Sequence, residues 1–278
     1  MPELPEVQAH AERLSAGFGG RVLERFQPIK FTALRTAVPP PDAAYGRPLL
    51  GVGRRGKFLL LEFEPVVFAV HLMQGGRLVP DAARSPKPRG GQARFVFDGP
   101  ALLLTEAGTE RRAGVWCLPA ATAGSSPPLD VLGPEADQVE PDTMNALLAA
   151  RNQRVHGFLR DQRALAGLGR RLANEVCHRA GLSPFAMTAR LGADGAERLV
   201  AAIRAVVDEG LTAERSRPDM SSSSDRPSAV HGRTGAACPV CGDAVRAVEY
   251  SGYTVNYCAT CQTGGKVLAD NTTSKFLK

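Results

Sequence analysis

The residues that most clearly indicate chemistry stand at the start of the chain, where residues 1–6 read MPELPE. Pro2 is small enough for the initiator methionine to be trimmed, which would leave a secondary amine with the carboxylate of Glu3 beside it. An α-amino group has a reference pKa of about 8, against about 10.4 for lysine. It therefore loses its proton more readily and becomes a neutral nitrogen nucleophile that can attack carbon. A prolyl amine is more basic than the average terminus, so its site must still lower its pKa. The alternative is a frayed tail that happens to hold these residues.

Four cysteines near the C-terminus form two CxxC pairs, Cys238 with Cys241 and Cys258 with Cys261, and sixteen residues separate the pairs. Each pair can turn both sulfurs toward one ion, and four thiolates match tetrahedral zinc. The spacer alternates as a hairpin does, with its turn at residues 251–252. We therefore expect a zinc ribbon whose single Zn²⁺ is structural, because four protein ligands leave no open position. Four free thiols or a redox pair would not explain the paired spacing.

Arginines are concentrated in residues 151–179, which hold seven of them and only two acids. Gly167 and Gly169 stand between helical stretches of this segment. They predict a tight turn with outward-facing amides, and such a turn at a helix N-terminus binds phosphate. The alternative is a helix hairpin with a solvated basic face.

The elements that must position these groups differ between the two halves of the chain. Directly after Pro5, which suits a first helical turn, apolar side chains recur on one helical face at Val7, Ala11, Leu14 and Phe18. Residues 21–118 then alternate short apolar runs with Pro- and Gly-rich loops, which predicts a β-sandwich or barrel. Strands are expected over residues 58–63, 66–72, 95–97 and 102–105.

Changes in composition mark the expected domain boundaries. The stretch 124–128 is rich in Gly, Ser and Pro and indicates a linker, and the periodicity becomes helical from Pro141. Residues 217–233 are polar and indicate a mobile loop. We expect a catalytic helix and β-sandwich over 1–120, a linker over 121–140, a helical domain over 141–234 with a mobile loop at about 213–234, a zinc finger over 235–264 and a basic extension over 265–278.

The composition is that of a globular protein, and its positive charge is compatible with a polyanionic partner but does not by itself establish one. The 278 residues suffice for two domains, and the formal net charge of +6 is carried mostly by arginine, which suits phosphate. No apolar run approaches the roughly 20 residues that span a bilayer, and no secretory signal begins the chain. We therefore expect a cytoplasmic protein without membrane contact. In that compartment six cysteines indicate metal binding or a catalytic role and not disulfides. Cys117 and Cys177, which stand apart from the other four, are expected to be small core residues.

These features together resemble the formamidopyrimidine-DNA glycosylase and endonuclease VIII family of bacterial base-excision repair enzymes. The resemblance covers nearly the whole chain. It is carried by the PELPE start, Arg54-Arg55-Gly56-Lys57-Phe58-Leu59, His71-Leu72-Met73, Arg111-Arg112, Asp161-Gln162 with Gly167-Leu168-Gly169, Ala173-Asn174-Glu175, Ala180-Gly181-Leu182-Ser183-Pro184, His231-Gly232-Arg233-Thr234-Gly235 and Cys261-Gln262.

The resemblance implies an α+β, two-domain fold. An N-terminal helix and two-layer β-sandwich are followed by a helix–two-turns–helix domain with a C-terminal β-hairpin zinc finger. It also implies a monomer used at the bacterial nucleoid. Its partner is damaged double-stranded DNA that lies between the domains with one nucleotide flipped out.

The catalytic roles carried over from the family fall on four residues. Pro2 is the expected nucleophile that attacks the sugar C1′ and forms a Schiff base, after which β-elimination cuts the strand. Glu3 is the expected general acid and base. Lys57 is expected to reach the phosphate beside the lesion, the alternative being a solvated strand-end lysine. Glu6 either supports the site or caps the first helix turn.

The expected DNA contacts are Met73, Arg111, Arg112, Arg151, Arg170 and Tyr253. Met73 would fill the gap left by the flipped nucleotide, unless it is an ordinary core residue. Arg111 would fill the gap or meet the partner base, and Arg112 would contact a phosphate.

The chain also departs from the family pattern. Ala113 replaces a Phe wedge, Arg170 replaces an Asn, and Tyr253 replaces the finger Arg that is linked to δ-elimination. The oxidised base that is excised therefore stays open between purines and pyrimidines. Two other readings remain: an inactive zinc-ribbon DNA-binding relative, and a metalloenzyme, which would need an open coordination position.

Overall fold

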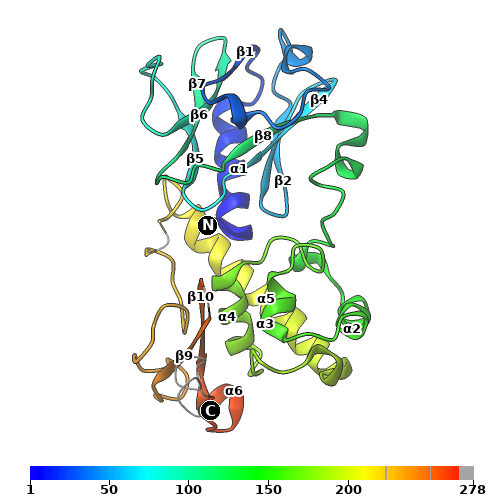
Figure 1. The fold of residues 1–278 in the computed structure, drawn as a ribbon, viewed down its shortest axis with the longest axis vertical. Helices are drawn as coiled ribbons and strands as arrows, with labels where there is room; N and C mark the ends of the chain where they lie inside the picture. Colours follow the sequence, from blue (N-terminus) through cyan, green and yellow to red (C-terminus); the bar gives the residue numbers. More distant parts are fainter. Residues whose placement is uncertain (223, 251, 269–278) are drawn as a thin grey trace. The chain divides into compact units, whose positions relative to one another are not determined.

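The computed structural model describes residues 1–222, 224–250 and 252–268, and the chain divides into two compact units (Figure 1). The N-terminal unit comprises Met1–Val131 and Glu214–Ser223, and the C-terminal unit comprises Leu132–Ala213 and Ser224–Lys278. Of the expected basic extension, residues 269–278 lie outside the described residues. No helix in the described part of the chain is both long and apolar enough to cross a bilayer.

Two antiparallel four-stranded sheets form the body of the N-terminal unit. One has the order β1-β6-β7-β5 and the other the order β2-β3-β4-β8. The strands are β1 (Leu23–Pro28), β2 (Gly51–Arg55), β3 (Phe58–Glu62), β4 (Val66–His71), β5 (Gly76–Pro80), β6 (Gly91–Phe97), β7 (Ala101–Glu106) and β8 (Gly114–Pro119). Short 3-10 turns at Phe31–Ala33, Pro41–Ala44 and Ala120–Ser125 join or follow them.

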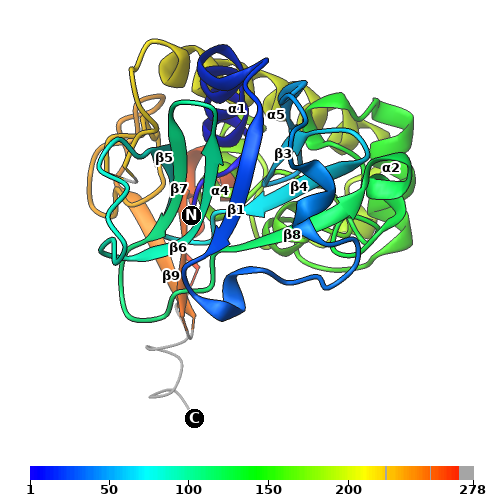
Figure 2. The same ribbon diagram turned by 90° about the horizontal axis from the view of Figure 1, so that it is seen from above.

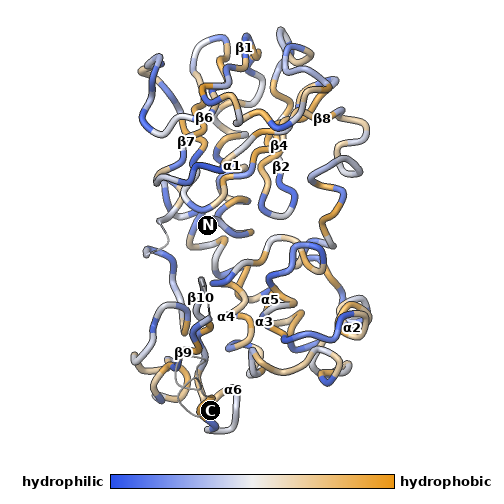
Figure 3. The backbone as a smooth tube through the Cα atoms, in the orientation of Figure 1, coloured by the Kyte–Doolittle hydropathy of each residue, from blue (hydrophilic) through white to orange (hydrophobic). Residues whose placement is uncertain are grey.

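The core of this unit lies between the two sheets. Phe68 of β4 packs against Phe26 of β1 at a ring separation of 5.7 Å and against Phe95 of β6 at 5.2 Å. These rings come from opposite layers, so the unit is the predicted two-layer sandwich. Figure 3 shows hydrophobic stretches in the strands of both sheets and more hydrophilic residues in the joining loops.

Helix α1 (Leu4–Phe18) packs against strands β2 and β3 with the apolar face that the sequence predicts. In Figure 2, which looks from above, the helix lies near β3. Val7, Ala11, Leu14 and Phe18 are all at most 5% exposed. Phe18 at the end of the helix packs on Phe97 of β6 at 5.5 Å. The helix thus fixes its first turn, with Pro2 and Glu3, against the sandwich.

The segment Glu214–Ser223 lies inside the expected 213–234 loop and packs with the N-terminal unit. Met220 is 8% exposed and belongs to the sandwich core. The carboxylate of Glu214 accepts the Ser221 N–H at 3.2 Å, and the Glu214 carbonyl accepts from Arg13 at 3.0 Å. Arg77 also donates to the Ser221 carbonyl at 3.2 Å. Residues that are distant in sequence from the strands therefore complete the packing of this unit.

His10 on α1 is a neutral histidine buried in the sandwich. Its Nε2 donates to the Leu78 carbonyl at 2.8 Å. Burial is the main cause that lowers the pKa of His10 to about 4, and the positive charges of Arg13 and Arg77 lower it further. The hydrogen bond to Leu78 and the negative charge of Asp219 act in the opposite direction. In the unfolded chain the same group titrates near 6.5. Between these two values the unfolded chain binds more protons, so stability falls as the pH falls.

At pH 5 we expect His10 to lower the free energy of unfolding of the N-terminal unit by about 2 kcal/mol relative to neutral pH. Trp116 of β8, the single tryptophan, reports this unit by its fluorescence in urea melts. His10→Gln keeps a donor for the Leu78 carbonyl but does not titrate. Between pH 7 and pH 5 its free energy of unfolding should therefore fall by about 2 kcal/mol less than that of the wild type. An equal loss in both proteins would contradict the assignment.

The C-terminal unit consists of helices and one β-hairpin. Its elements are α2 (Pro141–Ala150), α3 (Val155–Arg160), α4 (Arg170–Arg179), α5 (Gly192–Arg215, whose last two residues belong to the N-terminal unit), β9 (Val245–Tyr250), β10 (Tyr253–Cys258) and α6 (Ala259–Thr263), with 3-10 turns at Ala136–Gln138 and Thr188–Arg190. Strands β9 and β10 pair antiparallel from Tyr250 with Tyr253 to Val245 with Cys258. The predicted α+β class is therefore confirmed, including the C-terminal hairpin that carries cysteines.

Candidate active site

The N-terminus of α1 holds three of the predicted catalytic residues. Pro2, Glu3 and Glu6 are all buried, with Glu3 4% and Glu6 1% exposed. Glu3 is the N-cap, and its backbone N–H donates to the Glu6 carboxylate at 2.6 Å in a capping box. Glu6 therefore caps the first turn and in doing so fixes the main chain of Glu3.

Lys57 lies in the tight turn between β2 and β3, next to Gly56, which has a φ of +56°. Arg54 ties this turn to α1, because it donates to the Gln8 side chain at 3.1 Å and to the Gly56 carbonyl at 3.1 Å. The turn and the start of α1 lie at the same edge of the N-terminal unit (Figure 1). Lys57 is only 5% exposed, unlike a solvated strand-end lysine.

Met73 lies in the turn after β4, near the same strand ends, because His71 pairs with Phe58 beside Lys57. Its φ of +51° is unusual for a residue with a side chain, and the side chain is partly exposed. Such strain persists where the surroundings impose it, often at functional positions. Met73 is therefore not an ordinary core methionine.

His71 holds the Met73 turn in this conformation. The Met73 N–H donates to His71 Nδ1 at 3.0 Å, which requires that nitrogen to be unprotonated. Burial, and then the charge of Lys57, lower the pKa of His71 to about 4, so the ring is neutral at physiological pH. Gly76 closes the turn by donating to the Leu72 carbonyl at 2.8 Å, and a Cβ there would lie 2.1 Å from that oxygen.

Arg111 and Arg112 lie in the exposed loop between β7 and β8. Arg111 donates to the Gly108 carbonyl at 3.1 Å, and Arg112 pairs with Glu110 at 2.7 Å. The side chains of Arg112 and Glu110 are 71% and 76% exposed, so their ion pair is weak and an incoming phosphate can replace it.

Two further arginines, which the sequence analysis missed, share a pocket with Arg111. Arg77, Arg89 and Arg111 line a pocket of about 540 Å³ together with Glu106. No short-range motif marks Arg77 or Arg89, since they come from different strands and loops. Ala113 belongs instead to the core, with 1% exposure, and its N–H donates to Glu106 at 2.5 Å.

In the C-terminal unit, the predicted turn at Gly167–Gly169 leads directly into α4, with Gly169 as N-cap and Arg170 as the first helical residue. Gln162 braces the turn, because its side chain accepts from the Gly167 N–H at 3.0 Å and donates to the Leu168 carbonyl at 2.8 Å. The φ of +104° at Gly167 explains the glycine there.

The remaining predicted contacts of this unit lie on its surface. Arg170 is exposed, and Arg151 pairs with Asp161 at 2.7 Å, with side chains 45% and 31% exposed. Tyr253 begins β10 and lies against Arg160 and Arg170. Arg160 belongs to the arginine-rich segment 151–179, but no sequence motif indicates a separate role for it.

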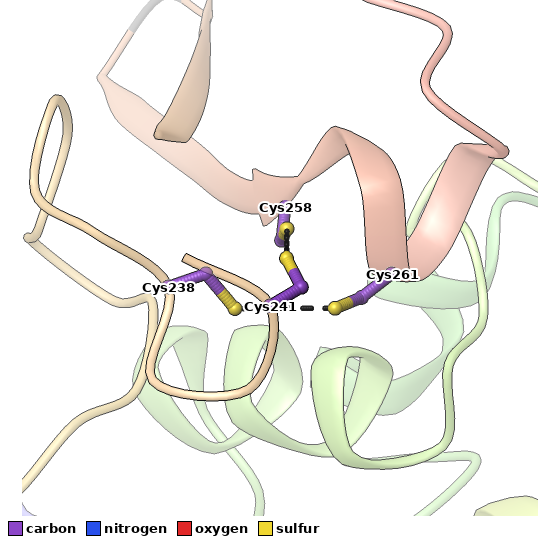
Figure 4. A group of neighbouring side chains, drawn as sticks. All are labelled: Cys238, Cys241, Cys258 and Cys261. Atoms are coloured by element: carbon purple, nitrogen blue, oxygen red, sulfur yellow. Dashed lines mark hydrogen bonds between the residues drawn. The ribbon is translucent and has the colours of Figure 1, made fainter. Parts of the chain in front are cut away.

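The four cysteines form one compact cluster (Figure 4). Their sulfurs lie within 4.8 Å of one another, with Cys238 to Cys261 at 3.9 Å and Cys241 to Cys258 at 3.3 Å. Four sulfurs around a zinc ion at about 2.3 Å lie about 3.8 Å apart. The donor set and its spacing therefore fit a tetrahedral metal ion.

Neighbouring groups favour the thiolate form of one cysteine of this cluster, Cys238. Burial alone raises the pKa of Cys238, but the N–H groups of Cys241 and Val240 and the His178 ring lower it to about 6, which favours the thiolate. His178 Nε2 lies 3.2 Å from the Cys238 sulfur. Gln262 accepts the Cys258 N–H at 2.8 Å and donates to the Leu182 carbonyl at 2.9 Å, which docks the hairpin on the helices.

Comparison with known proteins decides the family. Residues 1–115 match the formamidopyrimidine-DNA glycosylase N-terminal domain, and residues 132–222 match the formamidopyrimidine-DNA glycosylase H2TH domain. The formamidopyrimidine-DNA glycosylase of Bordetella parapertussis is 32% identical over 277 residues, which cover 94% of this chain and 99% of that protein. The chain belongs to the formamidopyrimidine-DNA glycosylase family.

Solved structures of the formamidopyrimidine-DNA glycosylase family share the fold. The MutM (Fpg) protein from Thermus thermophilus superimposes with a TM-score of 0.81 at 28% identity, and the match covers 96% of this chain and all of that chain. The Lactococcus lactis Fpg in complex with DNA containing an abasic site gives a TM-score of 0.83 at 20% identity, covering 94% and 99% of the two chains.

Within this family fold, the predicted site residues form two groups. The N-terminal unit carries Pro2, Glu3, Glu6, Lys57, Met73, Arg111 and Arg112. The C-terminal unit carries Arg151, Arg170, Tyr253 and the four cysteines. Cys117 and Cys177 are fully buried core residues, as predicted, and burial raises the pKa of both thiols.

Proposed function

We propose that this protein is a bifunctional DNA glycosylase and AP lyase that removes oxidised bases from double-stranded DNA and then cuts the strand by β-elimination. The observation that carries the proposal is the capped start of α1, where Pro2 and Glu3 are buried at the edge that also holds Lys57 and Met73. A frayed tail would not be buried and capped in this way. Removal of Met1, which is 43% exposed, would free the Pro2 amine.

The proposed chemistry begins with the Pro2 amine in its neutral form, because a protonated amine has no lone pair with which to attack. Its nitrogen forms a bond to the sugar C1′ while the bond from C1′ to the base breaks, and the base leaves with a proton. Glu3 donates a proton to the ring oxygen O4′ as the sugar opens. The product is an iminium ion between Pro2 and C1′.

Strand cleavage follows from that cation. The iminium acidifies the C2′ hydrogen, and its loss expels the 3′ phosphate by β-elimination. Water then hydrolyses the iminium and returns the amine. Lys57 supplies a positive charge near the phosphate beside the lesion and is the candidate proton donor for the elimination.

The proposed partner and cofactor follow from the surface and the cysteine cluster. The net charge of +6, the exposed Arg111, Arg112 and Arg170, and the DNA complex of the Lactococcus relative support damaged duplex DNA as the substrate. We further propose that the protein acts as a monomer. Cys238, Cys241, Cys258 and Cys261 would hold one structural Zn²⁺, which supplies folding energy and no reaction step.

The test combines covalent trapping with analysis of products. Purified protein that begins at Pro2, as verified by mass spectrometry, is incubated with abasic duplex DNA and borohydride, and separately with duplexes that each carry one defined oxidised base. We expect a stable protein–DNA adduct, base release, and 3′ ends of the β-elimination type. Binding without any adduct or base release would favour the inactive DNA-binding relative.

Met73 provides a separate prediction about damage recognition. Unstacking a nucleotide costs a few kcal/mol, and Met73→Ala removes the side chain that would fill the gap, so excision of a damaged base from duplex DNA should fall by about tenfold or more. Cleavage of an abasic site, where no base must be flipped, should fall much less. Leu50→Ala, an exposed residue of the same unit at 60% exposure, serves as the control. Equal losses on both substrates would contradict a gap-filling role.

A further inference from the structure

We propose that Arg160 and Arg170, held against the ring of Tyr253, form a clamp for one backbone phosphate of DNA. In this clamp the two guanidinium groups bind the phosphate, and Tyr253 is the positioning residue that holds them. The proposal rests on the proposed DNA-binding function. To the contacts already predicted it adds Arg160 and the joint action of both arginines on one phosphate.

The three side chains come from three elements of the C-terminal unit. The guanidinium carbon of Arg160, at the end of α3, lies 4.2 Å from the centroid of the Tyr253 ring, and that of Arg170, at the start of α4, lies 5.7 Å from it. The two guanidinium carbons therefore lie within about 10 Å of each other. The face of an aromatic ring attracts cations, which explains why both remain there.

Within the described part of the chain, no acidic side chain pairs with Arg160 or Arg170. Other arginines of this unit pair with carboxylates, as in the pairs of Arg151 with Asp161, Arg179 with Glu209 and Arg204 with Glu140. Across residues 1–222, 224–250 and 252–268, no carboxylate lies within ion-pair distance of Arg160 or Arg170. Two like charges near one ring repel each other, and an anion between them would remove that repulsion.

The ring itself is fixed in place by its neighbours. Tyr253 stacks on Tyr250 of the adjacent strand at 4.9 Å with planes 11° apart, and it is nearly parallel to His156 at 6.1 Å. The Tyr250 hydroxyl accepts a hydrogen bond from Arg154. A ring held in this way limits the freedom of the guanidinium groups against it, so less entropy is lost when they bind an anion.

The chemistry of the site selects a phosphate diester. A guanidinium presents a planar fork of donors that matches two phosphate oxygens. Arg170 also stands at the positive end of α4, a ten-residue helix that follows the braced turn at Gly167–Gly169. Tyr253 carries no positive charge itself, so the two arginines supply the charge at this position of the hairpin.

The experiment measures binding to a duplex with a tetrahydrofuran abasic analogue, which the enzyme cannot cleave by β-elimination, between about 50 and 200 mM salt. The plot of log affinity against log salt descends, and its slope, taken as a magnitude, decreases by about 0.9 for each lost phosphate contact. Because the clamp holds one phosphate, Arg160→Gln or Arg170→Gln should lower this slope by up to about 0.9 and the affinity by about 5–10-fold at about 0.1 M salt. Arg190→Gln, at an exposed arginine of the same unit, should change neither.

Tyr253 variants test the positioning role. Tyr253→Phe keeps the ring and should bind as the wild type does, whereas Tyr253→Leu should lower the slope as loss of an arginine does. In the Tyr253→Leu background, Arg160→Gln should cost much less than it does alone, because the arginine is no longer held. Zinc content and thermal melts of each variant establish that the unit is folded.

Three results would overturn the clamp. The first is an unchanged slope in both arginine variants, and the second is additive effects of Tyr253→Leu and Arg160→Gln. The third is lower affinity at constant slope in Tyr253→Leu alone, which would indicate stacking on a base. In these cases the trapped adduct of the wild type would still support the glycosylase function, whereas a wild-type protein that binds no DNA would overturn both.

Discussion

A Pro2→Gly variant is expected to form no borohydride-stable adduct with abasic DNA, and its strand cleavage should fall by about 1,000-fold or more, as for loss of a covalent nucleophile. Glycine offers a primary amine on a flexible residue, whereas the pyrrolidine ring of proline restrains a secondary amine beside Glu3. Gel mobility of the trapped complex and the rate of strand cleavage measure the two effects.

The controls for Pro2→Gly separate chemistry from folding. The variant should bind the tetrahydrofuran duplex with nearly the affinity of the wild type, and its Trp116 unfolding transition should be unchanged. Wild-type protein with an uncleaved N-terminal extension should also bind DNA without forming an adduct. If Pro2→Gly is trapped as efficiently as the wild type, another amine is the nucleophile, and the buried Lys57 is the first to test.

Cys238→Ser and Cys258→Ser are expected to remove the metal and to lower DNA affinity by about 100-fold or more, since structural zinc supplies about 10 kcal/mol or more of folding free energy to small domains. One zinc per chain in the wild type and none in the variants is the expected result by atomic absorption. The hairpin that carries Tyr253 depends on this cluster, so the clamp should be lost with it.

The N-terminal unit should survive these cysteine changes. Trp116 lies in β8, and its fluorescence transition in urea should stay at the wild-type midpoint in both variants. Cys117→Ala, a buried cysteine outside the cluster, should keep one zinc per chain and the wild-type DNA affinity. A variant that keeps full zinc and full affinity would show that the four sulfurs are not a metal site.

Features set by local spacing could be predicted from the sequence. The apolar stripe of α1 depends only on helical periodicity, and the cysteine pairs depend only on the CxxC spacing and a hairpin between them. The order of the motifs then led to the family, which the comparisons confirm. The domain boundaries, the roles of the site residues and the identity of the metal stay predictions.

Features that join distant residues could not be predicted in the same way. Arg160 and Tyr253 are 93 positions apart, and no pattern in either segment indicates that one side chain lies against the other. The positive φ of Met73 arises from the bond to His71 and the close approach of Gly76 to Leu72, which depend on how β4 and β5 are joined. Whether Glu6 supports the site or caps the first helix turn likewise could not be decided without the position of its carboxylate, which accepts from the Glu3 N–H.

The return of Glu214–Ser223 to the sandwich has a practical consequence for dissecting the protein. The polypeptide passes from one compact unit to the other three times, at positions 131, 213 and 223. A truncation after Val131 would therefore discard Met220 and leave an apolar hole in the fragment that remains. A recombinant N-terminal unit would need this segment attached through a short linker. A protease cut within the segment would destabilise a unit whose main body ends at Val131, separated from the segment by residues 132–213.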